Sequence, residues 1–242
     1  MTCKTICCIR RSAAISHAMA YLSKAGLPVS AYPTGKTGYL LLPVPSFPHG
    51  NAYLEELLPQ LPKGTVICGG NLGSHGNFTT VDFLKDPYYL AENAAITARC
   101  AMSIVQERTE LKGCSVLVLG WGRIGKCLWK FMSDLGAWVT VAARKPEDLA
   151  MIRALGGKSV PIRSVDKDLT SYNVILNTVP AMILPEMISA PDAVILELAS
   201  IPGMAGDNII SARGLPGLMA PEESGKLIAE TFIRLLLKEE SA

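Results

Sequence analysis

The chain has 242 residues, of which 49% are hydrophobic and 18% charged. This length allows one large or two small domains, and the apolar share excludes disordered, coiled-coil and collagen-like chains. The 23 basic and 21 acidic residues leave a net charge of +2 and form no basic stripe, which gives no support to nucleic-acid binding. The sequence shows neither a bilayer span nor a signal-peptide pattern, so we expect no membrane segment and a cytoplasmic location.

The seven cysteines are an odd number and lack the paired short spacings of zinc ligands or redox pairs. Only Cys3, Cys7 and Cys8 cluster, in an apolar run where Cys7 and Cys8 would point to opposite faces of a strand. We therefore expect reduced, mostly buried thiols and no metal site.

The first half is typical of a small α/β domain, and we expect a flavodoxin-like fold. Strands are predicted at residues 5–9, 39–42 and 66–68, and helices at 12–25 and 53–58. A stretch without Gly or Pro, residues 88–108, predicts a long helix, so residues 88–112 should connect two domains. The final helix begins near Pro221 and should pack back on residues 1–87, giving a substrate or partner domain of 1–87 with 221–242.

The second half alternates strand and helix patterns at the spacing of βαβ units. This predicts a Rossmann-type, doubly wound parallel sheet over residues 113–220. The predicted strands are 115–119, 138–142, 173–177, 193–197 and 208–212, with a short run near Val160, and the predicted helices are 123–135 and one opened by Pro146.

A glycine-rich loop follows the strand at 115–119 and opens the next helix. In this context Gly120 permits a tight turn, Gly122 lets a pyrophosphate approach the backbone, and Gly125 lets the helix pack against the strand. The helix N-terminus would then bind the anion. We interpret the loop as a dinucleotide site rather than a ligand-free turn, with Gly120, Trp121, Gly122, Arg123, Ile124 and Gly125 in contact with the cofactor.

The end of the next strand distinguishes NAD from NADP, because NAD sites normally place an acid there for the ribose hydroxyl. Here the positions hold Ala143, Arg144 and Lys145. Two cations suit a 2′-phosphate, so we predict NADP rather than NAD. The alternative is that both side chains are simply solvated at a strand end.

Two later strand ends should border the nicotinamide, because open α/β sheets bind ligands at the carboxyl ends of their strands. A simple turn before Pro180 is the alternative for Asn177 and Thr178. The predicted cofactor contacts here are Asn177, Thr178, Val179, Pro180, Leu198 and Ala199.

The two-domain order and the Gly-x-Gly-Arg-Ile-Gly loop resemble D-2-hydroxyacid dehydrogenases. That family uses a histidine on its nucleotide domain as acid or base, yet His17, His49 and His75 all lie in the first half. His75 stands in a glycine-rich loop, where solvation is the main alternative to a catalytic role.

Three later motifs are Ile175-Leu176-Asn177-Thr178-Val179-Pro180, Glu197-Leu198-Ala199-Ser200-Ile201-Pro202-Gly203 and Gly214-Leu215-Pro216-Gly217-Leu218-Met219-Ala220-Pro221. Together with the glycine loop they resemble the family of dipicolinate synthase A subunits more closely. The resemblance is strongest over residues 114–236 and implies oxidation of dihydrodipicolinate to dipicolinate with a nicotinamide cofactor. It also implies a second, flavoprotein-like dipicolinate synthase chain (the B subunit) and the mother cell of an endospore-forming bacterium.

The chain departs from that family in its first domain, which is short. Cys8-Ile9-Arg10-Arg11 stands where relatives have a Gly-Gly-Asp turn, and Arg99 replaces an acid on the connecting helix. The substrate side is therefore expected to be altered.

For the chemistry we predict Glu197, Ser200 and Arg99. Glu197 or Ser200 would remove a proton or contact substrate, while Arg99 or Arg123 would receive a substrate carboxylate. Alternatives are a helix-capping or salt-bridged acid at a strand end for Glu197 and a loop hydroxyl bonded to its own backbone for Ser200. A non-catalytic NADP-binding subunit, or a different NAD(P)-dependent dehydrogenase, is the second hypothesis for the whole chain, and homo- or hetero-oligomers are expected.

Overall fold

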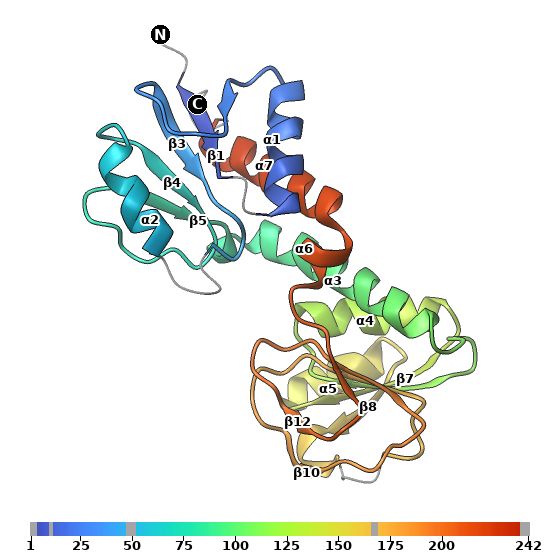
Figure 1. The fold of residues 1–242 in the computed structure, drawn as a ribbon. Helices are drawn as coiled ribbons and strands as arrows, with labels where there is room; N and C mark the ends of the chain where they lie inside the picture. The colour runs from blue at the N-terminus through green and yellow to red at the C-terminus, as the bar shows by residue number, and fades with distance from the viewer. Residues whose placement is uncertain (1–3, 10–11, 47–51, 166–168, 238–242) are drawn as a thin grey trace. The chain divides into compact units, whose positions relative to one another are not determined.

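The computed structural model describes residues 4–9, 12–46, 52–165 and 169–237 (Figure 1). The chain divides into two compact units, Met1–Asn93 with Pro216–Ala242 and Ala94–Leu215. The interpretations placed on Cys3, Arg10, Arg11 and His49 lie outside the described residues. Within the described ranges, no helix is both long and apolar enough to cross a bilayer.

The first unit contains a five-stranded parallel sheet in the order β2-β1-β3-β4-β5. This is the flavodoxin-like order 2-1-3-4-5, so the predicted fold of this half is confirmed. Two strands, β2 and β5, are not predicted from the sequence, because β2 is only two residues long and β5 has only one apolar residue among its four. The strands are β1 Thr5–Cys8, β2 Val29–Ser30, β3 Thr37–Leu41, β4 Val66–Gly69 and β5 Thr79–Asp82.

Helices fill only some of the connections in this sheet. The α1 helix (Ala13–Lys24), capped by the Ser12 hydroxyl, joins β1 to β2, and α2 (Ala52–Leu57) with the short 3₁₀ turn η1 (Leu58–Gln60) joins β3 to β4. Residues 31–36 and 70–78 connect their strands without a helix. A second 3₁₀ turn, η2 (Phe83–Lys85), follows β5 and precedes α3 (Pro87–Gln106), the long helix that contains the division between the units.

The terminal helix α7 (Pro221–Leu236), which follows the short α6 (Leu215–Met219), packs on the first half as predicted. Its Gly225 lies against the backbone of α1 at Ala14 and Ala18. Its Phe232 meets the ring of Tyr39 on β3 edge to face, with ring centroids 5.2 Å apart. Helix α7 therefore covers the sheet together with α1.

The described cysteines are free thiols, as expected, and all but Cys127 are buried. Cys7 and Cys8 lie on the central strand β1, where burial raises the pKa of Cys7 to about 11. Burial and the neighbouring Cys7 raise the pKa of Cys8 to about 12. These thiols are therefore protonated near neutrality and pack as small apolar side chains.

The second unit contains a six-stranded parallel sheet in the order β13-β11-β9-β6-β7-β8. Read from β6, this is the doubly wound order 3-2-1-4-5-6 of dinucleotide-binding sheets, which confirms the predicted Rossmann-type fold. The strands are β6 Ser115–Leu119, β7 Trp138–Ala143, β8 Lys158–Pro161, β9 Val174–Asn177, β11 Val194–Glu197 and β13 Ile209–Ser211.

The alternation of strand and helix holds for only half of this sheet. Helices α4 (Arg123–Asp134) and α5 (Pro146–Ala154) lie in the first two crossovers, and the 3₁₀ turn η3 (Ile162–Ser164) follows β8. The connection from β9 to β11 contains the short strand β10 (Leu184–Met187), and the connection from β11 to β13 contains β12 (Met204–Ala205). These two strands pair with each other.

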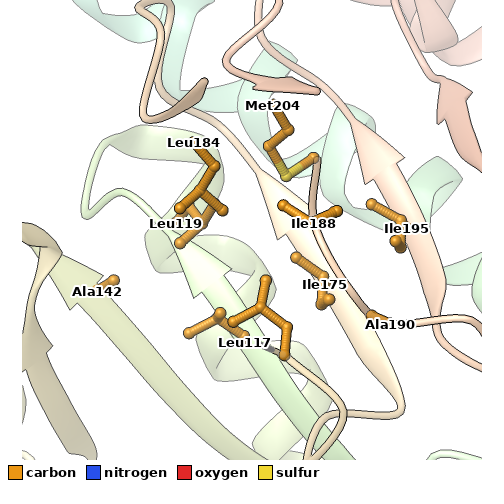
Figure 2. Packing of buried hydrophobic residues seen from close by; sticks show 10 residues of the cluster. Leu117, Leu119, Ala142, Ile175, Leu184, Ile188, Ala190, Ile195 and Met204 are labelled. Atoms are coloured by element: carbon orange, nitrogen blue, oxygen red, sulfur yellow. The ribbon is translucent and has the colours of Figure 1, made fainter. Parts of the chain in front are cut away.

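The segments around β10 and β12 take the place of helices on one face of the sheet. Their apolar side chains form one core cluster with the sheet residues beneath them (Figure 2). The cluster consists of Leu117, Leu119, Ala142, Leu169, Ile175, Leu184, Ile188, Ala190, Ile195 and Met204.

Candidate functional site

The predicted cofactor residues of the second unit meet at the carboxyl edge of its sheet. Leu119 at the end of β6 pairs with Ala142 on β7 and with Asn177 on β9, and Asn177 pairs with Glu197 on β11. These four strands therefore end level with one another. The loops that follow them begin at Gly120, Arg144, Thr178 and Leu198.

The three loop glycines differ in what surrounds them. Gly120 has φ +106°, and a Cβ there would lie 2.5 Å from Thr178 Oγ1 and 2.8 Å from Val179 Cγ2. A Cβ on Gly125 would overlap the carbonyl oxygen of Gly120. At Gly122, by contrast, a Cβ would have no neighbour within 4 Å. The protein's own packing thus requires two of the glycines, and the space at Gly122 fits a group that approaches the backbone from outside.

The N-terminus of α4 lies beside that space. Gly122 is its N-cap and has no side chain to satisfy the helix, and the first turn contains no acid. The backbone N–H groups of Arg123, Ile124 and Gly125 therefore have no acceptor within the helix. Together with the helix dipole, they form a site suited to a pyrophosphate.

Trp121, the middle residue of the loop, packs against α4. Its ring meets that of Trp129 edge to face with centroids 5.5 Å apart, and Lys126 Nζ lies 5.7 Å from the Trp121 ring centroid. Lys126 thus adds a cation to the first turns of α4. Sequence reasoning did not single it out, although it directly follows the third glycine.

At the end of β7, Ala143 is buried whereas Arg144 and Lys145 are exposed. Lys145 Nζ lies 4.0 Å from Glu147 Oε1, and both side chains are more than half exposed, so this ion pair is weak. Both cations of the predicted 2′-phosphate site are therefore accessible from solvent.

The loop after β9 is shaped by the Asn177 side chain, which is completely buried. Its Oδ1 accepts the Val179 N–H at 3.0 Å, and its Nδ2 donates to the Val179 carbonyl at 3.2 Å. The Thr178 hydroxyl donates to the Leu119 carbonyl at 2.8 Å, which ties this loop to the glycine loop. Of the predicted contacts here, the exposed Pro180 and the half-buried Thr178 and Val179 are open to a ligand, whereas the Asn177 side chain is not.

Glu197, at the end of β11, is only 3% exposed. Its carboxylate accepts two hydrogen bonds from Asn177 Nδ2, at 2.9 and 3.0 Å. It also accepts the N–H groups of Ala199 at 3.1 Å and Gly203 at 2.8 Å. Proton removal from a substrate does not fit this geometry, because the carboxylate is buried and already hydrogen-bonded to protein donors.

The remaining predicted residues differ in accessibility. Leu198 and Ala199 are buried, whereas Ser200, Ile201 and Pro202 are exposed, so Ser200 is the exposed polar side chain between β11 and β12. Arg99 lies on α3 with an exposed side chain. The roles predicted for Ser200 and Arg99 therefore stay predictions.

No family model matches the chain. It is 33% identical over 199 residues to the A subunit of dipicolinate synthase from Bacillus subtilis (strain 168), an alignment that covers 77% of this chain and 62% of that relative. The matched part therefore spans less than two thirds of the relative.

Solved structures extend the likeness in fold. The A subunit of dipicolinate synthase from Bacillus halodurans matches 96% of this chain and 97% of its own, with a TM-score of 0.82 and 22% identity. Its counterpart in dipicolinate synthase from Bacillus subtilis matches 100% and 98%, with a TM-score of 0.79 and 23% identity. A transhydrogenase from Sinorhizobium meliloti matches 90% and 79%, with a TM-score of 0.62 and 15% identity. The chain is therefore similar to one dipicolinate synthase A subunit in sequence over 77% of its own length, and similar to two such subunits in fold over nearly all of it.

Proposed function

We propose that this chain is a nicotinamide-dependent oxidoreductase that forms dipicolinate from dihydrodipicolinate. The observation that carries the proposal is the open space at Gly122, next to an uncapped helix N-terminus at the carboxyl edge of a Rossmann-type sheet. The likeness to the A subunit of dipicolinate synthase supplies the substrate class.

We infer that NADP is the preferred cofactor. The bound nicotinamide would supply the hydride acceptor. Gly122 leaves room for the pyrophosphate, and the first N–H groups of α4 bind its charge. Arg144 and Lys145 are accessible at the end of β7, and residues 142–145 include no acid that could accept a hydrogen bond from a ribose hydroxyl.

The reaction requires little of the protein beyond positioning of the substrate. Oxidation of a dihydropyridine gives an aromatic ring, so the chain mainly has to orient substrate and accept a proton. With the Glu197 carboxylate engaged inside the protein, Ser200 is the exposed polar group of the β11 loop. We assign Ser200 to substrate contact and Arg99 to a substrate carboxylate.

We propose that the chain works in the cytoplasm of a sporulating mother cell with a second, flavoprotein-like subunit. The designation of its relative as one subunit of a synthase supports a multi-subunit enzyme. A non-catalytic NADP-binding subunit is the second candidate, favoured by the presence of Arg99 where an acid is expected.

The decisive experiment supplies fresh dihydrodipicolinate and NADP, with and without the cognate second subunit. NADPH and dipicolinate should appear at equal rates, above the spontaneous oxidation measured without protein. A Gly122→Val variant serves as the control that lacks cofactor binding. NADP binding without dipicolinate under either condition would favour the non-catalytic subunit.

Arg99→Glu then separates the two interpretations of that position. If Arg99 holds a substrate carboxylate, the change should raise KM, whereas if it replaces an essential acid, the change should raise kcat. Arg108→Glu, at an exposed arginine just beyond the end of α3, is the matched charge-reversal control.

A further inference from the structure

We propose that Glu197 is a positioning residue that sets the loop after β9 for the nicotinamide half of the dinucleotide. This inference rests on the proposed cofactor site and assigns Glu197 a part in binding without contact to any ligand. It follows from a chain of contacts that leads from the carboxylate to the glycine loop.

The first step is the position of the carboxylate between two loops. Glu197 and Asn177 are paired residues at the ends of neighbouring strands. The carboxylate accepts hydrogen bonds from the Asn177 amide, which is itself bonded to Val179 in the loop after β9, and from the backbone N–H groups of Ala199 and Gly203 in the loop after β11. The carboxylate therefore joins the loop after β9 to the loop after β11.

The second step concerns charge. Among the described residues, no Lys, Arg or His side chain forms an ion pair with Glu197. N–H donors alone therefore compensate a charge that is 3% exposed. A glutamine has the same shape, but its NH₂ group would face one of these donors, so it cannot reproduce the arrangement.

The third step leads to the cofactor loop. The Asn177 side chain is hydrogen-bonded to both the N–H and the carbonyl of Val179. The Thr178 hydroxyl donates to the carbonyl of Leu119, the residue directly before Gly120. Displacement of Asn177 therefore moves Thr178 and Val179 relative to the glycine loop. Because β9 and β7 flank β6 on opposite sides, the β9 loop borders the half of the dinucleotide away from Arg144.

Gly203 offers a second way to disturb the same contacts. A Cβ there would lie 2.5 Å from Asn177 Nδ2 and 2.6 Å from the Ala181 carbonyl oxygen. Gly203→Ala therefore displaces the Asn177 side chain while residue 197 remains a glutamate.

The test compares two probes that share the adenosine half, NADP and adenosine 2′,5′-bisphosphate. In Glu197→Gln the Kd for NADP should rise about tenfold or more, while the Kd for the bisphosphate stays within about twofold. Glu110→Gln, at an exposed acid of the same unit, should change neither. Gly203→Ala should repeat the pattern of Glu197→Gln and replaces it if that variant does not fold.

The outcomes separate this inference from the proposed function. If the role of Glu197 is purely structural, Glu197→Gln should lower the unfolding free energy and either leave both Kd values unchanged or raise both equally. Either result overturns the inference. If the unaltered protein binds neither probe, the result contradicts the proposed cofactor site itself, and the inference with it.

Discussion

Gly125 faces the carbonyl oxygen of Gly120 so closely that a methyl group on Gly125 would overlap it. Gly122, between them, would carry the same methyl group into open space. One loop thus contains a glycine that the packing of the fold requires and a glycine beside which there is open space.

We expect Gly125→Ala to destabilise the protein, because the new Cβ forces α4 away from the end of β6. Overpacking of this kind costs about 1–3 kcal/mol. Urea unfolding measures the difference, and an unchanged midpoint and slope would show that the helix adjusts freely.

Gly122→Val should leave folding intact and abolish NADP binding. The backbone at Gly122 is extended, with φ −78° and ψ −170°, a conformation that valine also adopts. The added side chain would occupy the space assigned to the pyrophosphate. Calorimetric titration with NADP checks this, and normal binding would exclude the loop from the cofactor site.

Arg144→Ala should weaken NADP and leave NAD unaffected, because only NADP carries the 2′-phosphate. Loss of a charge-assisted hydrogen bond costs about 1.5–3 kcal/mol, or roughly tenfold to a hundredfold in Kd. Lys158→Ala removes an exposed cation from the amino end of the adjacent strand β8 and is the matched control. Equal affinity of the unaltered protein for both dinucleotides would refute the NADP assignment.

Asp86 links the start of α3 to α7 in the first unit. Its carboxylate accepts the Tyr89 N–H at 2.7 Å and pairs with both terminal nitrogens of Arg234, at 3.3 and 2.5 Å. Partial burial opposes ionisation, but the Arg234 and backbone hydrogen bonds outweigh it, so the pKa of Asp86 is lowered from its ordinary value of 3.8. The ionised form is therefore favoured in the folded protein.

Asp86→Asn keeps a capping side chain and removes the ion pair, so it should lower the unfolding free energy by about 1 kcal/mol at pH 7. Because the pKa of Asp86 is lower in the folded protein than the unfolded value of 3.8, the ionised carboxylate stabilises the folded protein above that pH. The stability difference between the variant and the unaltered protein should therefore fade as pH falls below it. Urea unfolding at several pH values tests this. Asp134→Asn, in the exposed pair with Lys130, should cost no more than about 0.5 kcal/mol.

The sequence predicts the fold best where pattern and packing agree. The strand at 115–119 and the helix after it were expected almost to the residue, because an apolar β-type run is followed by spaced glycines. Strands β10 and β12 were missed because they have four and two residues, and β10 is largely exposed. Their role depends on pairing with each other across 20 residues of chain, which no local pattern shows.

The candidate site can likewise be predicted from the sequence only in part. The spacing of Gly120, Gly122 and Gly125 is a local signal and predicts the loop directly. The position of Glu197 depends on Asn177, twenty residues earlier, and on backbone N–H groups two and six residues later. Its residue type suggests a catalytic acid or base, and only the burial and these partners show that it holds loops together.

Gly225 allows helices α1 and α7 to approach each other closely. A Cβ there would overlap the Ala14 carbonyl oxygen and lie 2.6 Å from His17 Cβ and 2.8 Å from the Ala18 nitrogen. Two of these three atoms are backbone and cannot rotate away, so Gly225→Ala should separate the helices and cost about 1–3 kcal/mol despite the higher helix propensity of alanine. Gly217→Ala, in the same unit, meets nothing within 4 Å and should be neutral or slightly stabilising. Thermal or urea unfolding of both variants distinguishes packing from propensity, because propensity alone predicts that the two substitutions act in the same direction.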